Sequence, residues 1–272
     1  MKLVFICVNY NNFGFTQKFI ESINLLHGHS ERDISIIIVD NKSTDDSIEE
    51  LKKINKENVS VIFSDENIGY FKGLNLGIQA IDTKNYDYIV IGNNDLYFQQ
   101  DFLLQLEKRK LDKEIFAIAP NIIRLDGIHQ NPHIVEKFGT FAKIYRRLFF
   151  TNFYISILLQ KIFNVFRSSL KPINRDGFDR EQIITMGYGA CYLLTRNFFL
   201  NFKELDAPNF LMGEEGVLAN QIIGANGKTL YIPDLVVMHH DHSSIGKISN
   251  KKMYNFSRES YYYYLKHLKH IQ

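Results

Sequence analysis

Short apolar runs alternate with amphipathic stretches through the first part of the chain. Four of these runs are rich in β-branched residues and are bounded by polar turn residues, which is typical of buried strands. They are Leu3–Val8, Ile34–Asp40, Val59–Phe63 and the run from Tyr88 to Phe98.

Three helices are expected between these strands. Apolar residues between Phe15 and Leu26 fall on one helical face, Ser43 with Asp46 is typical of a helix start, and Gly69–Ala80 is a glycine-interrupted helix. Strands that alternate with helices predict a mostly parallel central sheet with helices on both faces, which is an α/β fold.

The second half of the chain predicts a further set of elements. Gly187–Thr195 has the pattern of a strand, and a helical stripe follows between Val217 and Ile223, with Gly227 as its stop. The segment LYIPDLVVMH predicts two short strands, and Lys251–Gln272 predicts one amphipathic helix.

A basic, aromatic-rich segment lies between these two halves. Residues 138–174 contain no acidic residue and six basic ones, with aromatic and aliphatic residues between them. Helical segments of this composition bind membrane surfaces, which predicts a peripheral membrane contact through residues 143–171. The alternative is a helical hairpin that packs on the domain and keeps its Lys and Arg head groups in water.

Composition narrows the class of protein. The 272 residues are 45% hydrophobic and 23% charged, which is typical of a globular protein, and a net charge of +2 does not favour nucleic acid as a partner. Cys7 and Cys191 lie in apolar stretches and are expected to be buried thiols, which suits a cytoplasmic protein. The apolar run at the N-terminus is too short for a signal peptide, and none is long enough to span a bilayer.

Polar residues follow three of the predicted strands. Asn93, Asn94 and Asp95 interrupt the fourth apolar run, Asp40 ends the second strand, and the turn Asn9–Asn12 follows the first. Ligands of open α/β sheets bind beyond the carboxyl ends of such strands, where Asp95 could hold a hard cation and Asp40 could accept from a base or a ribose. Turn formation and helix capping are the alternative explanations for the same residues.

Three glycines recur at a spacing of four residues. Gly69, Gly73 and Gly77 would lie on one helical face, where they allow close approach of a ligand or of a neighbouring element. Lys72 and the helix N-terminus could meet phosphate, whereas packing against a neighbour is the alternative. The segment matches neither a P-loop nor a dinucleotide fingerprint, which disfavours a nicotinamide-dependent oxidoreductase.

Two groups of side chains suggest catalysis. Glu214 and Glu215 precede an apolar helix, and because adjacent residues point in different directions, at most one is expected to act as a general base. Two solvated acids in the first turn of a helix are the alternative. A histidine cluster follows the last predicted strand: His239, His240 and His242. One His that joins Asp95 on a hard cation is favoured over a zinc cluster, because no HExxH or paired Cys accompanies them.

Six segments together resemble the family 2 glycosyltransferases with the GT-A fold, and they occur in that family's order. They are VNYNN, VDNKSTDDS, ENIGYFKGLN, IGNNDLYF, FLMGEEGVL and IPDLVVMHHDHSS. The likeness is dense over residues 2–94 and returns over 187–244, and bacterial enzymes that build capsule or O-antigen polysaccharides look most similar. The resemblance implies a sugar-nucleotide donor, a divalent cation (Mn²⁺ or Mg²⁺) and inversion at the anomeric carbon.

The resemblance implies a donor and metal site. Asp40 matches the acid that contacts the base or ribose, and Asp95 matches the last acid of the family's metal motif. Asn93 stands where that motif begins with Asp, and His239 matches a metal or diphosphate contact. The full set expected at the donor is Asn9, Tyr10, Asn11, Asp40, Asn67, Gly69, Lys72, Asn75, Asn93 and Asn94.

The resemblance also implies a base and a reaction. Glu215 matches the catalytic base, with Glu214 in reserve. The expected enzyme is an inverting glycosyltransferase that moves a sugar from UDP or dTDP to a hydroxyl of a growing surface polysaccharide or lipid-linked oligosaccharide. We expect it in the cytoplasm, with peripheral contact at the inner face of the cell membrane. A catalytically impaired sugar-nucleotide-binding protein and a sugar nucleotidyltransferase are the alternatives.

Four parts of the chain follow from this interpretation. Residues 1–125 would bind the sugar nucleotide, residues 126–182 would form the basic helical insertion, residues 183–248 would hold the acceptor and the base, and residues 249–272 would form a C-terminal helix.

Overall fold

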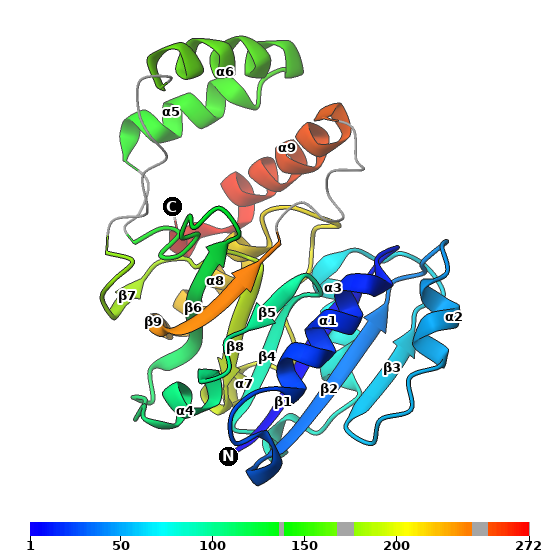
Figure 1. Ribbon diagram of the computed structural model, residues 1–272. Helices are drawn as coiled ribbons and strands as arrows, with labels where there is room; N and C mark the ends of the chain where they lie inside the picture. The colour runs from blue at the N-terminus through cyan, green and yellow to red at the C-terminus, as the bar shows by residue number, and fades with distance from the viewer. Residues whose placement is uncertain (136–138, 168–176, 241–249, 272) are drawn as a thin grey trace.

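The structure is a computed structural model that describes residues 1–135, 139–167, 177–240 and 250–271. Within these residues a nine-stranded sheet is flanked by helices, in the strand order β3-β2-β1-β4-β8-β6-β9-β5, with β7 also paired to β9 (Figure 1). The strands are β1 Lys2–Asn9, β2 Asp33–Asp40, β3 Val59–Phe63, β4 Tyr88–Asn93, β5 Leu96–Phe98, β6 Ile115–Arg124, β7 Gln182–Ile184, β8 Cys191–Thr195 and β9 Lys228–His239.

The predicted mostly parallel sheet is confirmed. Strands β1 to β4, β6 and β9 run in one direction, whereas β5, β7 and β8 run in the other. Asn9 lies opposite Asp40 in the β1–β2 register, and Val8 lies opposite Asn93 in the β1–β4 register. The polar residues that end the first, second and fourth strands therefore meet at one edge of the sheet.

Helices cover both faces of the sheet, as predicted. They are α1 Phe13–Asn24, α2 Ser47–Lys52, α3 Tyr70–Gln79, α4 Phe102–Glu107, α5 Thr140–Phe149, α6 Phe153–Arg167, α7 Arg196–Asn201, α8 Glu214–Gly224 and α9 Asn250–His267. One core lies between the sheet and α1 and α4, and another lies between the sheet and α3, α7 and α8.

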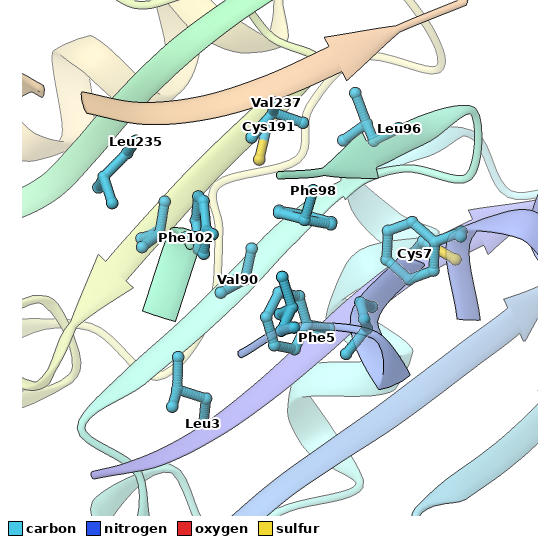
Figure 2. Packing of buried hydrophobic residues seen from close by; sticks show 14 of the residues in the cluster. Leu3, Phe5, Cys7, Val90, Leu96, Phe98, Phe102, Cys191, Leu235 and Val237 are labelled. Carbon is cyan, nitrogen blue, oxygen red and sulfur yellow. The ribbon is translucent and has the colours of Figure 1, made fainter. Parts of the chain in front are cut away.

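Alternation along β1 supplies side chains to both cores. Leu3, Phe5 and Cys7 point into the first core, and the residues between them point into the second. In the first core the rings of Phe5 and Phe98 meet edge to face at 5.0 Å (Figure 2). Cys7 and Cys191 are both free and buried, as expected.

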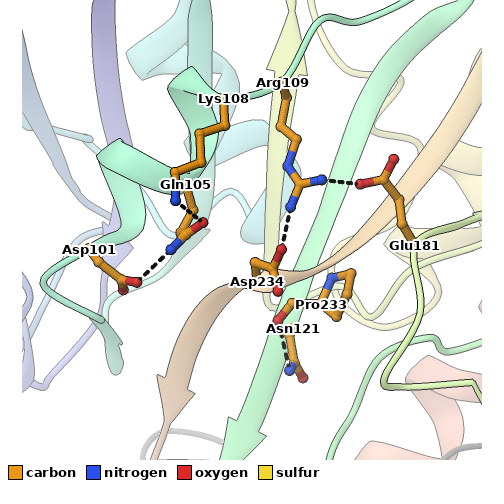
Figure 3. Close-up of polar contacts among 8 residues, drawn as sticks. All are labelled: Asp101, Gln105, Lys108, Arg109, Asn121, Glu181, Pro233 and Asp234. Carbon is orange, nitrogen blue, oxygen red and sulfur yellow. Dashed lines mark hydrogen bonds and ion pairs between the residues drawn. The ribbon is translucent and has the colours of Figure 1, made fainter.

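The segment predicted as two short strands is one strand, β9, with a bulge. Pro120 of β6 pairs with Ile232, but the next residue, Asn121, pairs with Val236. Asn121 Nδ2 donates to the Pro233 carbonyl oxygen at 3.1 Å, which holds the bulge (Figure 3). The prediction was wrong because a proline, which cannot donate to a ladder, can be accommodated in a bulge without ending the strand.

The basic segment forms a helical hairpin of α5 and α6, which lie beside each other at the end of the molecule beyond α9 (Figure 1). Its corner packs on α9, where Phe150 stacks on Tyr261 at 4.6 Å between ring centroids. The outer faces stay exposed, with Phe141 at 89% and Tyr154 at 72%. Residues 168–171 of the predicted membrane segment lie outside the described residues. Among the described helices, none combines the length and apolar character that a membrane span requires.

Candidate active site

Asp40 organises the edge of the sheet between β1 and β2. Its Oδ1 accepts from Asn9 Nδ2 at 2.8 Å and from Ser43 Oγ at 2.6 Å, and its Oδ2 accepts from the Ser43 backbone N–H at 2.9 Å. Ser43 therefore does not start a helix, and the helix-start prediction was wrong: α2 begins at Ser47. Instead, the Ser43 hydroxyl donates to the Asp40 side chain, which is only 1% exposed.

A second set of hydrogen bonds joins this edge to the end of β4. Asn94 Nδ2 donates to Thr16 Oγ1 at 2.8 Å, and Thr16 Oγ1 donates to Asn9 Oδ1 at 2.8 Å. Thr16 was not among the predicted residues, because nothing in its helical context distinguishes it from a core position. Asn11 bonds to Thr44 in the turns that follow β1 and β2, with its Oδ1 accepting from the Thr44 N–H at 2.6 Å. Nearby in the sequence, the ring of Tyr10 is exposed.

The loop before α3 is built on amide side chains. Asn41 Nδ2 donates to Asn67 Oδ1 at 3.0 Å and to the Gly69 carbonyl oxygen at 3.1 Å. Gly69 has a φ of +90°, and a Cβ there would lie 2.1 Å from the Phe210 carbonyl oxygen. Only glycine therefore fits where the 210 segment crosses the N-terminus of α3.

The glycine face of α3 packs on β1. A Cβ at Gly77 would lie 2.4 Å from Ile6 Cγ2, and one at Gly73 would lie 2.9 Å from Val8 Cγ2. For these two glycines the packing alternative is therefore correct. Lys72 is exposed. Asn75 is bonded to the backbone of Leu205 through both ends of its amide, at 2.8 and 3.0 Å, so we assign it a structural role in place of the predicted donor contact.

The predicted metal pair is in contact. Asp95 Oδ1 and His239 Nε2 lie 3.3 Å apart, and both side chains are buried. Asn93 Nδ2 lies 3.4 Å from the same His239 nitrogen. Pairing of Leu96 with His239 in the β5–β9 ladder produces this contact between residues that are far apart in the sequence.

Gln130 orients the His239 ring and was missed by sequence reasoning. Its Oε1 lies 2.7 Å from His239 Nδ1. An amide oxygen only accepts, so Nδ1 carries a proton, and in the neutral ring the lone pair of Nε2 faces Asp95. Within the described residues no group of three or more His, Cys, Asp and Glu gathers as a metal site. The zinc cluster, which the sequence already disfavours, is disfavoured further by His240, whose ring lies 5.0 Å from that of Phe15, and His242 lies outside the described residues.

The donor set at Asp95 and His239 fits a divalent cation. A carboxylate oxygen and an unprotonated imidazole nitrogen face each other, and a hard cation of this kind commonly completes its shell with substrate phosphates and water. The Gln130 hydrogen bond is the type of outer contact that fixes a ligating histidine. Asn93 adds an amide beside them, so two protein ligands with a third polar neighbour are available.

Glu214 and Glu215 occupy different surroundings. Glu214 Oε1 accepts from the Met212 N–H at 2.9 Å, and the side chain is buried. Burial, and then the charge of Glu215, raises the pKa of Glu214 to about 7. Two solvated acids in a helix start are therefore the wrong interpretation, because Glu214 is buried in the first turn of α8 and accepts from the backbone of the preceding loop.

Glu215 faces the segment before β8. A Cβ at Gly189 would lie 3.2 Å from Glu215 Oε2, so the carboxylate lies directly against this glycine. Burial raises the pKa of Glu215, whereas a hydrogen bond to its own backbone and the charge of Arg146 lower it. A carboxylate with a raised pKa is suited to take a proton near neutral pH.

The Tyr188–Ala190 segment lies between the two halves of the site. Asn93 donates its backbone N–H to the Ala190 carbonyl oxygen at 2.9 Å, and the Tyr188 ring lies 6.1 Å from that of His239. Glu215 meets the same segment at Gly189. Asp95, His239 and Glu215 therefore gather around one short segment. Its GYGA sequence, with two glycines before a strand, was the signal that could have identified it.

Comparison with known proteins identifies relatives of this arrangement. The family model described as "Glycosyl transferase family 2" matches residues 4–173. No curated protein matches the chain.

Solved structures resemble the whole fold. S. aureus TarS 1–349 superposes with a TM-score of 0.59 at 12% identity, covering 88% of this chain and 60% of that one. GalNAc-T7, with UDP, GalNAc and Mn²⁺, gives 0.55 at 14% identity, covering 88% and 44%. The mannosyltransferase PcManGT from Pyrobaculum calidifontis, with GDP-Man and Mn²⁺, gives 0.54 at 13% identity, covering 98% and 70%. The chain thus spans about half the length of the first two, and these likenesses establish the GT-A fold.

Proposed function

Because the chain belongs to glycosyl transferase family 2, it is a glycosyltransferase, and we propose that it moves a sugar from UDP or dTDP to an acceptor hydroxyl with inversion. The observation that carries this proposal is the position of the Glu215 carboxylate against Gly189, on the segment that also meets Asn93 and His239. A base on one side of this segment and a cation-binding pair on the other suit a substitution at a sugar carbon.

The donor side is proposed at the edge of the sheet formed by β1, β2 and β4. Asn9, Asp40 and the Asn93–Asp95 turn meet there, and Asp40 lies within a hydrogen-bonded loop that could receive a pyrimidine and its ribose. The related fold of TarS holds UDP-GlcNAc, and that of PcManGT holds GDP-Man. Direct contact of Asp40 with the base stays a prediction.

Asp95 and His239 would hold the divalent cation, as two relatives that contain Mn²⁺ suggest. When bound, such a cation neutralises charge that develops on a departing diphosphate. Gln130 keeps the His239 ring turned so that Nε2 faces Asp95.

Glu215 would remove the proton from the acceptor hydroxyl. The hydroxyl oxygen forms a bond to the anomeric carbon while the bond from that carbon to the diphosphate oxygen breaks, and the proton remains on Glu215. A single displacement of this kind inverts the anomeric centre. It needs one carboxylate, in contrast to glycosidases, which place two carboxyl groups across the bond.

Thermal unfolding with nucleotides tests the proposal. We expect UDP or dTDP to raise the midpoint more than GDP, and Mn²⁺ to increase the effect, since a ligand at a hundred times its Kd stabilises the folded state by about 2.7 kcal/mol. Slow release of free sugar from a UDP-sugar would then separate an enzyme from a binding protein that has lost activity. A chain that no nucleotide stabilises, with or without Mn²⁺, would refute the donor site.

For the acceptor we propose a growing surface polysaccharide or a lipid-linked oligosaccharide, reached from an anionic membrane surface. Helices α5 and α6 contain no acidic residue, and Lys143, Arg147 and Lys161 lie exposed among Phe141, Tyr154 and Leu158. Apolar side chains with interspersed cations suit phosphatidylglycerol. We expect the protein to sediment with vesicles of 30% phosphatidylglycerol and 70% phosphatidylcholine, and to be released by Phe141→Ser with Tyr154→Ser. Equal binding to neutral vesicles, or pairing of two copies through this face in their absence, would refute it.

A further inference from the structure

A groove lies between α5 and α9, outside the site described above. It has a volume of about 430 Å³, and its polar lining consists mainly of three cations and three tyrosines: Lys143, Arg146, Arg147, Tyr261, Tyr262 and Tyr264. Among the residues that the structure describes, no acidic one lines it. A groove of this size can hold part of a small ligand, and its charge selects for an anion.

Arg146 is held in place by the tyrosines. Its guanidinium lies 5.7 Å from the ring centroid of Tyr261 and 5.4 Å from that of Tyr264. Tyr261 is itself buried by its stack on Phe150. A planar guanidinium fixed over two rings loses little freedom when it binds, and its forked N–H groups match the oxygens of a phosphate.

Beside the groove, α9 contacts the residues that precede Glu214 and Glu215. Ser260, the neighbour of Tyr261 on α9, donates its hydroxyl to the Met212 carbonyl oxygen. A Cβ at Gly213 would lie 3.0 Å from Ser260 Cβ, so α9 and the start of α8 are in close contact there. The charge of Arg146 also lowers the pKa of Glu215, which is consistent with this proximity.

We propose that this groove binds a phosphate group of the acceptor, so that the acceptor hydroxyl is presented to Glu215. This inference rests on the proposed function and adds the chemical class of acceptor, a phosphate-bearing saccharide. The phosphate could belong to a lipid diphosphate that carries the sugar or to a phosphate within a soluble saccharide. In both cases Arg146 binds the phosphate oxygens, Lys143 and Arg147 add charge, and the tyrosines offer hydroxyls and ring faces.

Calorimetry with inorganic pyrophosphate in EDTA tests the groove. EDTA removes the divalent cation that the Asp95–His239 pair is proposed to hold, so this pair lacks the proposed diphosphate-binding group. We expect wild type to bind, Arg146→Gln to bind at least tenfold more weakly, and Arg147→Gln to weaken less. Lys251→Gln is the matched control, since it removes the same charge from an exposed position of α9 outside the groove. If wild type does not bind, or if the three variants bind alike, the proposal is overturned.

Two further measurements distinguish the two sources of the phosphate and separate loss of phosphate binding from loss of the fold. Farnesyl diphosphate that binds tenfold more tightly than pyrophosphate, with the gain lost in Arg146→Gln, assigns the phosphate to a lipid-linked acceptor, and equal affinities assign it to a soluble saccharide. Arg146→Lys, which keeps the charge but not the fork, should recover only part of the pyrophosphate affinity if the fold is intact. UDP affinity with Mn²⁺ should be the same in Arg146→Gln as in wild type. Loss of UDP binding in every protein would refute the proposed function, while the pyrophosphate result would still decide the groove.

Discussion

Replacement of Glu214 by Gln should stabilise the protein at neutral and alkaline pH and have little effect at acid pH. Burial, with the charge of Glu215 as a second cause, raises the pKa of Glu214 from 4.5 to about 7. A difference of one in pKa corresponds to about 1.4 kcal/mol, so the whole difference corresponds to roughly 3 kcal/mol. Gln keeps an oxygen that can accept from the Met212 N–H but never ionises.

The direction of the pH effect on the free energy of unfolding follows from the raised pKa of Glu214. Between pH 4.5 and about 7 the folded protein holds a proton on Glu214 that the unfolded chain has released, so the free energy of unfolding falls as the pH rises. Below this window the group costs nothing, and above it the full penalty is present. The stability difference between Glu214→Gln and wild type should therefore grow from near zero at pH 4.5 to roughly 3 kcal/mol at pH 8.

Unfolding in urea at pH 4.5, 6 and 8 measures this difference directly. Since unfolding entropy is about 2 cal/mol/K per residue, roughly 3 kcal/mol in a chain of 272 residues corresponds to about 5 °C in the thermal midpoint. Glu259→Gln, which removes an exposed carboxylate from α9, serves as the control and should show no comparable trend. A difference for Glu214→Gln that is constant across this range would contradict the reasoning.

Three further predictions concern the site. Glu215→Gln should keep UDP affinity while glycosyl transfer falls by at least about a hundredfold, and near-normal turnover would remove Glu215 as the base. Asp95→Ala should weaken UDP binding at least about tenfold with Mn²⁺ but leave it unchanged in EDTA, as isothermal calorimetry would show. Gly69→Ala should lower the free energy of unfolding by at least about 2 kcal/mol, because its φ is positive and a Cβ would meet the Phe210 carbonyl oxygen. Gly14→Ala is its control, since nothing lies within 4 Å of that position and alanine favours the helix by about 0.5–1 kcal/mol; equal losses would refute the Gly69 argument.

The first strands could be predicted because their signals are local. An apolar run such as Leu3–Val8 with polar residues after it fixes a strand and its end within a few positions, and β1 extends from Lys2 to Asn9. The insertion of β8 between β4 and β6 has no such signal. Its partners β4 and β6 lie about 100 and about 75 residues before it, and the antiparallel pairing depends on the whole sheet being assembled.

The distinction between local sequence signals and contacts made only in the folded chain also separates the predicted site residues from the missed ones. Asp95 and His239 carry chemistry that a sequence displays, so each could be proposed even though their contact depends on the β5–β9 ladder. Glutamine is not a residue type that marks a metal or catalytic site, and Gln130 lies 109 positions from His239 in the sequence. Ser43 shows the opposite failure. Its helix-start pattern is plausible, but the buried Asp40 carboxylate accepts hydrogen bonds from the hydroxyl and the backbone N–H of Ser43 as well as from Asn9.

The two adjacent glutamates show why the base could be narrowed to a pair but not to one residue. Successive positions on a helix differ in direction by about 100°, so the sequence predicts that only one carboxylate faces the reaction. Which one does is set by neighbours on other elements. The Met212 N–H, behind the start of α8, holds Glu214 inward. Gly189, before β8, has no Cβ and so leaves room for Glu215 to lie against it. The orientation of Glu215 thus depends on a glycine 26 positions away (215 minus 189), and only the folded sheet brings that glycine to α8.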